Sequence, residues 1–192
     1  MIRIDDSKQI KIHARDINIA SYAGDSRSIV VKGTLHDERL IHAFRPLGEK
    51  VPPGPIHHMI IRMQVSAAGL VIEDIDVEMP TAPNALCQAA LDSLRPVIGI
   101  PIVSGFTVRI KELVGGAKGC AHLVALLSAM APAAVQGAWN AMARKPVDPK
   151  HLPTAIERIK NTCMLWRSDG PFLREYEKKF SQMIEKTEPG KT

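Results

Sequence analysis

The chain has 192 residues, a formal net charge of +5 at pH 7 and 45% hydrophobic residues. This length is sufficient for one domain of ordinary size with a buried core. The 25 Lys and Arg residues are scattered, and two Trp, two Tyr and four Phe offer few rings for stacking on bases. We therefore expect no nucleic-acid partner, because proteins of that class carry clustered basic residues.

The N-terminal segment contains charged residues and lacks the apolar run of a signal peptide. The longest apolar run, residues 123–135, is interrupted by Ser128 and Pro132 and is too short for a bilayer span. The three cysteines are odd in number and widely spaced, which argues against a disulfide framework. We expect a bacterial cytoplasmic protein with free thiols and no membrane partner, and a homodimer is compatible with this composition.

The first predicted strand covers residues 10–20. Its apolar residues fall on one face and His13 and Arg15 on the other, which is the period of a half-buried strand. Residues 22–26 have turn composition. A returning strand at residues 28–35 then completes a hairpin.

The clearest predicted hairpin comprises residues 56–65 and 71–79, because both stretches alternate between apolar and polar residues. A five-residue loop between them would set Ile61 opposite Ile75. In that register His57 points towards the core, either as an ordinary hydrogen-bonded core histidine or as a functional one. Arg62 lies on the reverse face of the same strand.

The second half of the chain is predicted to be mainly helical. Asn84 has the residue type of an N-cap for a helix that ends at residue 95. Residues 106–114 alternate and predict a further strand. A helix follows from Cys120 to residue 144 with a kink at Pro132, and after a proline-rich linker two helices, residues 154–166 and one beginning at Pro171, complete the chain.

These elements predict an α+β fold, with an antiparallel sheet of about five strands and helices packed on one face. We place a core domain at residues 1–146. Residues 147–192 form a C-terminal helical extension that packs on this core.

Glycines precede the helix that starts at Cys120. Glycine-rich turns leave backbone N–H groups for an anion, which makes Gly119 a candidate ligand-binding residue. A thiol in the first helical turn and close to Lys118 is favoured as a reactive thiolate. Cys120 also shares a helix face with Leu123 and Leu127, which would make it a buried, inert side chain. Both interpretations stay open.

His122 lies two residues after Cys120, and two such positions on a regular helix point about 200° apart. The thiol and the imidazole can therefore act together only if Cys120 occupies the helix cap. A metal site built from Cys120, Cys87 and His122 would take zinc or iron and needs further ligands. The remaining candidates for such ligands are His13, His57, Asp37 and Cys163.

Two functions follow from these residues, and a third stands beside them. The first is a thiol and imidazole pocket that binds a metal ion or a small ligand, with His13, Arg15, Arg62 and Gly119 as ligand-binding residues. The second is a hydrolase or transferase acting on a small acyl or thioester substrate, with Cys120 as nucleophile and His57 or His122 as base. The third is a structural or partner-binding module, so the sequence leaves open whether the chain is an enzyme.

The chain resembles a bacterial family catalogued as domain of unknown function 2889. The resemblance rests on a His-x-Arg strand at His13, a His-x-Met-x-x-Arg strand at His57 and a Pro-x-x-x-Cys segment at Cys87. A Gly-Cys-x-His-Leu helix start at Gly119 is its most specific part, and a Cys-His pair of the family is Cys163-Met164 in this sequence. The family implies no known activity.

A fainter resemblance is to the iron–sulphur cluster assembly scaffold proteins. It rests on the order of an Ile-Glu-Asp strand, here Ile72-Glu73-Asp74, and a late helix that starts with a cysteine. The other cluster cysteines of those scaffolds have no match in this chain. The resemblance therefore implies a fold and not a function.

Overall fold

The computed structural model describes residues 7–23, 27–144 and 152–187. It contains one four-stranded antiparallel sheet, one two-stranded sheet and several helices, which confirms the α+β class. The elements are β1 (His13–Ala23), β2 (Ser28–Arg39), β3 (Ala43–Phe44), β4 (Lys50–Val51), β5 (Gly54–Ser66), β6 (Ile72–Thr81), η1 (Ala85–Val97), α1 (Phe106–Val114), η2 (Gly116–Lys118), α2 (Ala121–Met142), α3 (Leu152–Ile159) and α4 (Pro171–Thr187).

The main sheet has the order β1-β2-β5-β6, and each strand is antiparallel to its neighbour. Both predicted hairpins are therefore confirmed as strand pairs. In the first, β1 includes Tyr22 and Ala23, where the composition predicts a turn. Its faces are also reversed, because Ile10 and Ile12 are 80% and 58% exposed whereas Arg15 points to the buried Asp37. In the second hairpin Ile61 pairs with Val77 and not with Ile75, because the turn and a bulge after Gln64 each add one residue. A shift of two residues keeps each side chain on its predicted face, so the alternation of His57 and His58 survives the error.

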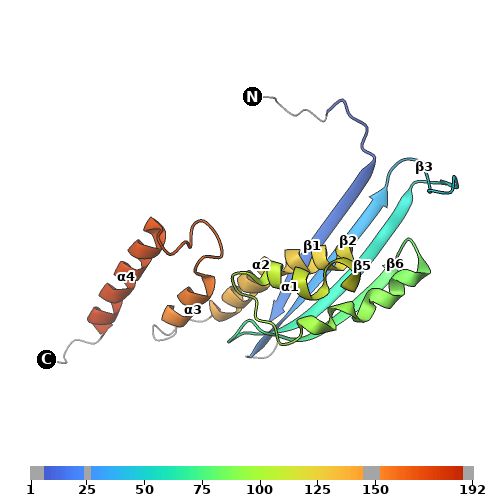
Figure 1. Cartoon of the computed structure of the whole chain (residues 1–192). Coiled ribbons are helices and arrows are strands. Elements are labelled where there is room, and N and C mark those ends of the chain that lie inside the picture. Colours follow the sequence, from blue (N-terminus) through green and yellow to red (C-terminus); the bar gives the residue numbers. More distant parts are fainter. Residues whose placement is uncertain (1–6, 24–26, 145–151, 188–192) are drawn as a thin grey trace.

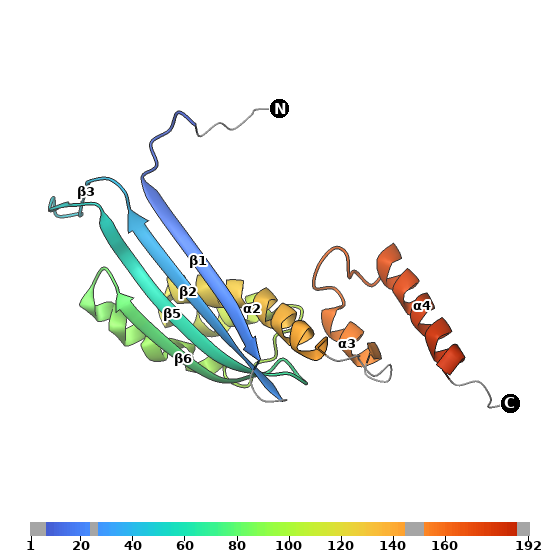
Figure 2. The same ribbon diagram turned by 180° about the vertical axis from the view of Figure 1, so that it is seen from behind.

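Helices cover one face of this sheet (Figure 1). Helix α2 packs against β2, β1 and β5, whereas η1 packs on β6 and against α1. Gly33 in β2 allows the close approach of α2, since a Cβ atom there would lie 2.6 Å from Sδ of Met130. None of the helices among the described residues covers the opposite face of the sheet (Figure 2).

The predicted strand at residues 106–114 is wrong, because this segment is the helix α1. Phe106, Ile110 and Val114 are buried whereas Val108 is 61% exposed. Burial thus follows the i, i+4, i+8 spacing of a helix and not the alternation on which the strand was predicted. Gly105 precedes the helix with a left-handed φ of 86°, a conformation that glycine adopts without strain.

Helix α2 begins at Ala121, and Cys120 is its N-cap with an extended backbone. The helix continues through Pro132 to Met142. Its 22 residues make it long and apolar enough to cross a membrane by length and composition, which corrects the expectation drawn from residues 123–135. In this fold 44% of its most apolar window is buried, and the buried residues pack on the sheet.

The C-terminal helices are α3 and α4. Helix α3 ends at Ile159, seven residues before the predicted end, and the segment that follows contains Asn161 with a positive φ of 60°. The predicted final helix at Pro171 is confirmed. Predictions for the N-terminal segment, the turn at 24–26, most of the linker and residues 188–192 lie outside the described residues.

Candidate functional site

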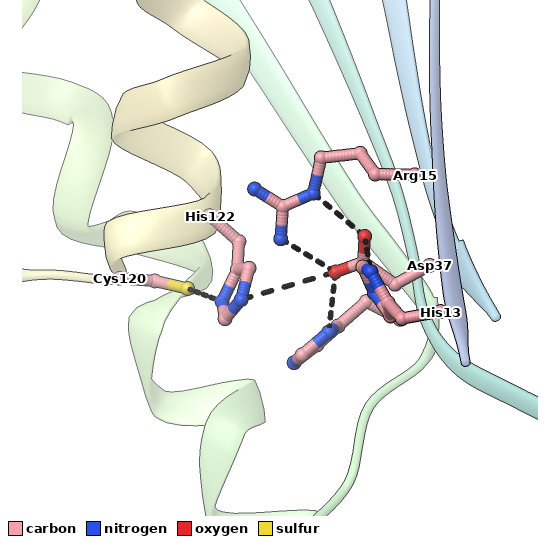
Figure 3. A network of polar contacts seen from close by, with 6 residues as sticks. His13, Arg15, Asp37, Cys120 and His122 are labelled. Atoms are coloured by element: carbon pink, nitrogen blue, oxygen red, sulfur yellow. Dashed lines mark hydrogen bonds and ion pairs between the residues drawn. The ribbon is translucent and has the colours of Figure 1, made fainter. Parts of the chain in front are cut away.

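Six side chains meet between three neighbouring strands, β1, β2 and β5, and the start of α2 (Figure 3). The sheet register places Arg15 of β1, Asp37 of β2 and His57 of β5 side by side on the helix-facing side. The start of α2 adds Cys120 and His122, and β1 adds His13. We call these residues the Asp37 cluster: His13, Arg15, Asp37, His57, Cys120 and His122.

Asp37 is the centre of the cluster and is 1% exposed. Arg15 donates two hydrogen bonds to its carboxylate, from Nε to Oδ1 at 2.6 Å and from Nη2 to Oδ2 at 2.7 Å. These bonds to the Arg15 guanidinium lower the pKa of Asp37 to about 2, against the opposing effect of burial. The carboxylate is therefore ionised at neutral pH.

This ionised carboxylate determines the tautomer of His57. Nδ1 of His57 lies 2.9 Å from Oδ2 of Asp37. A carboxylate without a proton can only accept, so Nδ1 must carry the hydrogen and donate it. When the ring is neutral, Nε2 then keeps its lone pair and can accept a proton or bind a metal ion.

His122 lies against His57, with ring centroids 3.8 Å apart and planes inclined by 33°. Its Nε2 is 3.9 Å from Oδ2 of Asp37. Burial lowers the pKa of His122, and the nearby His57 and Arg15 lower it further. His122 is accordingly a neutral imidazole at pH 7.

Cys120 completes the cluster from the cap of α2. Its Sγ lies 3.8 Å from Nδ1 of His122, and its side chain is half-buried. The geometric condition set by the sequence is met, because Cys120 is outside the helix proper and its thiol turns towards the imidazole. His13 lies at the solvent side, with Nε2 3.5 Å from Oδ1 of Asp37 and its side chain 45% exposed.

Three of these residues have the arrangement of a metal-binding group. One ligand atom each from Asp37, His57 and His122 lie within 4.8 Å of one another. Neutral imidazole and carboxylate together are a common ligand set for zinc and non-haem iron. Arg15 and His57 already occupy three of the roughly four acceptor positions of the carboxylate, so Asp37 has little capacity left for a direct metal bond.

Other residues selected from the sequence lie elsewhere. Arg62 is on the open face of the sheet, where it forms ion pairs with Asp76 and Glu78. Cys87 is partly buried against the hydrophobic core, and among the described residues it does not belong to the metal-binding group.

Gly119 and Cys163 also lie outside the Asp37 cluster. A Cβ atom on Gly119 would lie 2.6 Å from the carbonyl oxygen of Val114 and 3.0 Å from Oγ of Ser93, so its glycine is explained by the close approach of this connection to the end of α1 and to η1. Cys163 is exposed in the segment after α3.

Sequence reasoning named Asp37 as one ligand among several and missed its central place. The signal was present, because Asp37 continues the alternation of Ile29, Val31, Gly33 and Leu35 along one strand. All five are buried. A carboxylate in phase with a buried apolar face requires a cationic or hydrogen-bonding partner.

The comparison with protein families identifies residues 13–136 as matching the family described as proteins of unknown function, DUF2889. The chain belongs to this family. No curated protein and no solved structure matches it. The resemblance to iron–sulphur cluster assembly scaffolds therefore stays a prediction. The matched range of this DUF2889 protein contains every residue of the Asp37 cluster and excludes α3 and α4.

Proposed function

We propose that the Asp37 cluster binds a divalent transition-metal ion, with zinc and iron(II) as the candidates. The observation that supports the proposal most directly is the grouping of Asp37, His57 and His122 within 4.8 Å. Metal ligands must be deprotonated, and the lowered pKa values of Asp37 and His122 keep both groups in that form at neutral pH.

The hydrogen bonds from Arg15 determine whether Asp37 can bind the metal ion directly. Its two hydrogen bonds hold the carboxylate in place and neutralise its charge. We assign Asp37 as the carboxylate that orients His57, an arrangement found behind many metal-bound histidines. The metal ligands are then the imidazoles of His57 and His122, and the nearby Cys120 thiolate is the third candidate.

Protein purified without a histidine tag, analysed for metals by mass spectrometry, tests this proposal. Stoichiometric zinc or iron is expected in the parent protein and a loss of about tenfold or more in affinity in His57→Gln. His58→Gln is the matched control, because His58 is the next residue on β5 and faces the open side of the sheet. Equal metal loss in both variants would contradict the assignment.

Cobalt(II) titration of the metal-free protein identifies the ligands. A thiolate ligand gives an intense charge-transfer band, which should vanish in Cys120→Ser while weaker ligand-field bands remain. Binding should weaken as the pH falls, because protons compete with the metal ion for the imidazoles, and the lowered pKa of His122 moves the competition at that ring to lower pH. A protein that binds neither cobalt nor zinc would end the metal proposal.

A second candidate function rests on the contact between Cys120 and His122. The thiol lies 3.8 Å from Nδ1 of His122, whose Nε2 faces Asp37, which is the order of groups in cysteine hydrolases and acyltransferases. In this case neutral His122 takes the thiol proton, the sulphur bonds to the acyl carbon of a thioester, and the departing thiol takes that proton.

Alkylation by iodoacetamide, followed residue by residue with peptide mass spectrometry, separates the two candidates. The nucleophile proposal expects Cys120 to react faster than the more exposed Cys163 at neutral pH, and to lose this advantage in His122→Ala. Such reactivity in a metal-free protein favours the nucleophile. An unreactive Cys120 excludes it.

A further inference from the structure

A cavity lies away from the Asp37 cluster, between α1, the C-terminal half of α2 and the segment after α3. Its volume is about 690 Å³, within the range of small-molecule binding pockets. Ile102 and Phe106 line one wall, Val135 and Trp139 of α2 the second, and Trp166 the third.

The chemistry of this wall is unusually uniform. None of the 16 described residues that line the cavity is Asp, Glu, Lys, Arg or His, although charged residues make up 23% of the chain. Both tryptophans of the chain belong to the lining. The polar side chains of the lining are uncharged hydroxyl, amide and thiol groups, from Ser104, Thr107, Gln136, Asn161, Thr162 and Cys163.

The third wall is built by a structured loop. Asn161 accepts a hydrogen bond from the Ser168 backbone N–H at its Oδ1 (2.9 Å), and its own N–H donates to the Trp166 carbonyl at 2.9 Å. The Trp166 ring meets Phe172 and Tyr176 of α4 edge-on, at centroid distances of 4.9 and 5.8 Å. These contacts hold the indole in place, so the cavity is bounded on this side by a fixed aromatic ring.

We propose that this cavity binds a neutral, predominantly apolar small molecule, aromatic or alicyclic in character. An ion would lose its hydration in a wall that offers no opposite charge, whereas an uncharged ring would bury apolar surface against two indoles and aliphatic side chains. The uncharged hydroxyl and amide groups of the lining can supply hydrogen bonds that orient such a ligand.

This site is independent of the metal proposal. The Asp37 cluster lies at the first turn of α2, whereas the cavity begins at Ala131. The outer wall, with Ile159 and Trp166, lies beyond the residues 13–136 that match the family. The cavity is thus completed by a part of this chain outside the matched family region.

The uncharged fluorescent probe N-phenyl-1-naphthylamine tests the proposal on the full chain. Binding should saturate at one probe per protein and quench the tryptophan emission, because both tryptophans line the cavity. Thr107→Phe fills the cavity from α1 and should weaken binding roughly tenfold or more. Val108→Phe is the matched control, since Val108 neighbours Thr107 and is exposed to solvent instead of lining the cavity.

A second pair of variants covers the case in which Thr107→Phe fails to fold. Gln136→Phe fills the cavity from α2, whereas Asn140→Phe places the same ring one turn further on, outside the lining. Each variant removes the same Gln136–Asn140 hydrogen bond, so a difference between them reports the cavity. Selective loss of probe binding in the two filled variants supports the proposal. Absent or non-saturating binding, or equal effects within each pair, overturns it.

Discussion

The two faces of the main sheet use the same residue types in different ways. Asp37 and His57 lie opposite each other on the helix-covered face, and one residue away His36 and His58 lie opposite each other on the open face. The inner pair shares a hydrogen bond of 2.9 Å beneath α2. The outer rings meet edge-on at a centroid distance of 5.4 Å, with His36 exposed. Neighbouring residues on the same strand therefore belong either to the buried candidate site or to the open surface of the sheet.

The arginines of the two faces extend this comparison. Arg15 binds a carboxylate that is 2% exposed, whereas Arg62 binds Asp76 and Glu78, which are 66% and 46% exposed. Water and salt screen the outer pairs, and such pairs contribute about 0–1 kcal/mol. Removing one member of a buried pair leaves the other charge without compensation. The inner face should therefore dominate both stability and pH dependence.

Asp37→Asn is expected to have the largest effect. It removes the charge that compensates Arg15 and an acceptor of the His57 hydrogen bond, and should lower the free energy of unfolding by roughly 3 kcal/mol. Urea denaturation followed by circular dichroism measures this change. Asp76→Asn on the open face is the control and should change it by less than about 1 kcal/mol. Equal losses in the two variants would remove the distinction between the faces.

Acid should unfold the protein through the same carboxylate. The pKa of Asp37 is lowered from 3.8 to about 2 by Arg15, so the unfolded chain binds a proton at higher pH than the folded one. The resulting stability, on the order of 2 kcal/mol, is complete above pH 4 and is lost between pH 4 and 2. Unfolding free energies measured across this range should fall steeply in the parent protein and less steeply in Asp37→Asn.

Packing provides a smaller test of the covered face. Gly33→Ala places a methyl group 2.6 Å from Sδ of Met130, and displacing this flexible side chain should cost about 1 kcal/mol. Thr34→Ala, on the next residue and the open face, should change stability by less than about 0.5 kcal/mol. Thermal unfolding midpoints of both variants measure the difference. A stabilised Gly33→Ala would mean that α2 packs less closely than described.

Arg62→Gln should have the smallest effect. Its ion pairs with Asp76 and Glu78 are on the surface, so a loss of about 0.5 kcal/mol is expected, and high salt should abolish it. Urea titrations at low and high salt measure both quantities. A loss comparable to that of Asp37→Asn would show that the open face contributes as much as the covered one.

The sheet could be predicted because its strands alternate over many residues. The register error in β5 and β6 arose from a bulge, which depends on local backbone geometry and leaves no clear mark in the side-chain pattern. The error at α1 has a different origin. Nine residues with apolar side chains at Phe106, Val108 and Ile110 fit a strand and a helix almost equally well, and tertiary packing decides between them.

The sequence singled out five of the six residues of the Asp37 cluster as site candidates but did not predict that Asp37 lies at its centre. His13, Arg15, His57, Cys120 and His122 were all selected from motifs, and the structure brings them together. Their convergence depends on which strands are neighbours, which local sequence does not encode. Asp37 was underweighted because an acidic residue at a strand end is usually solvated, and its burial follows only once α2 is placed above it.

Helix α2 sets the spacing between the Asp37 cluster and the cavity. From the Cys120 cap to Ala131, where the cavity begins, 11 residues at 1.5 Å each give an axial separation of about 16 Å. A single-ring ligand within the cavity therefore cannot contact the thiol, and the two sites can be occupied at once. Metal binding and probe binding can therefore be titrated separately on the same protein.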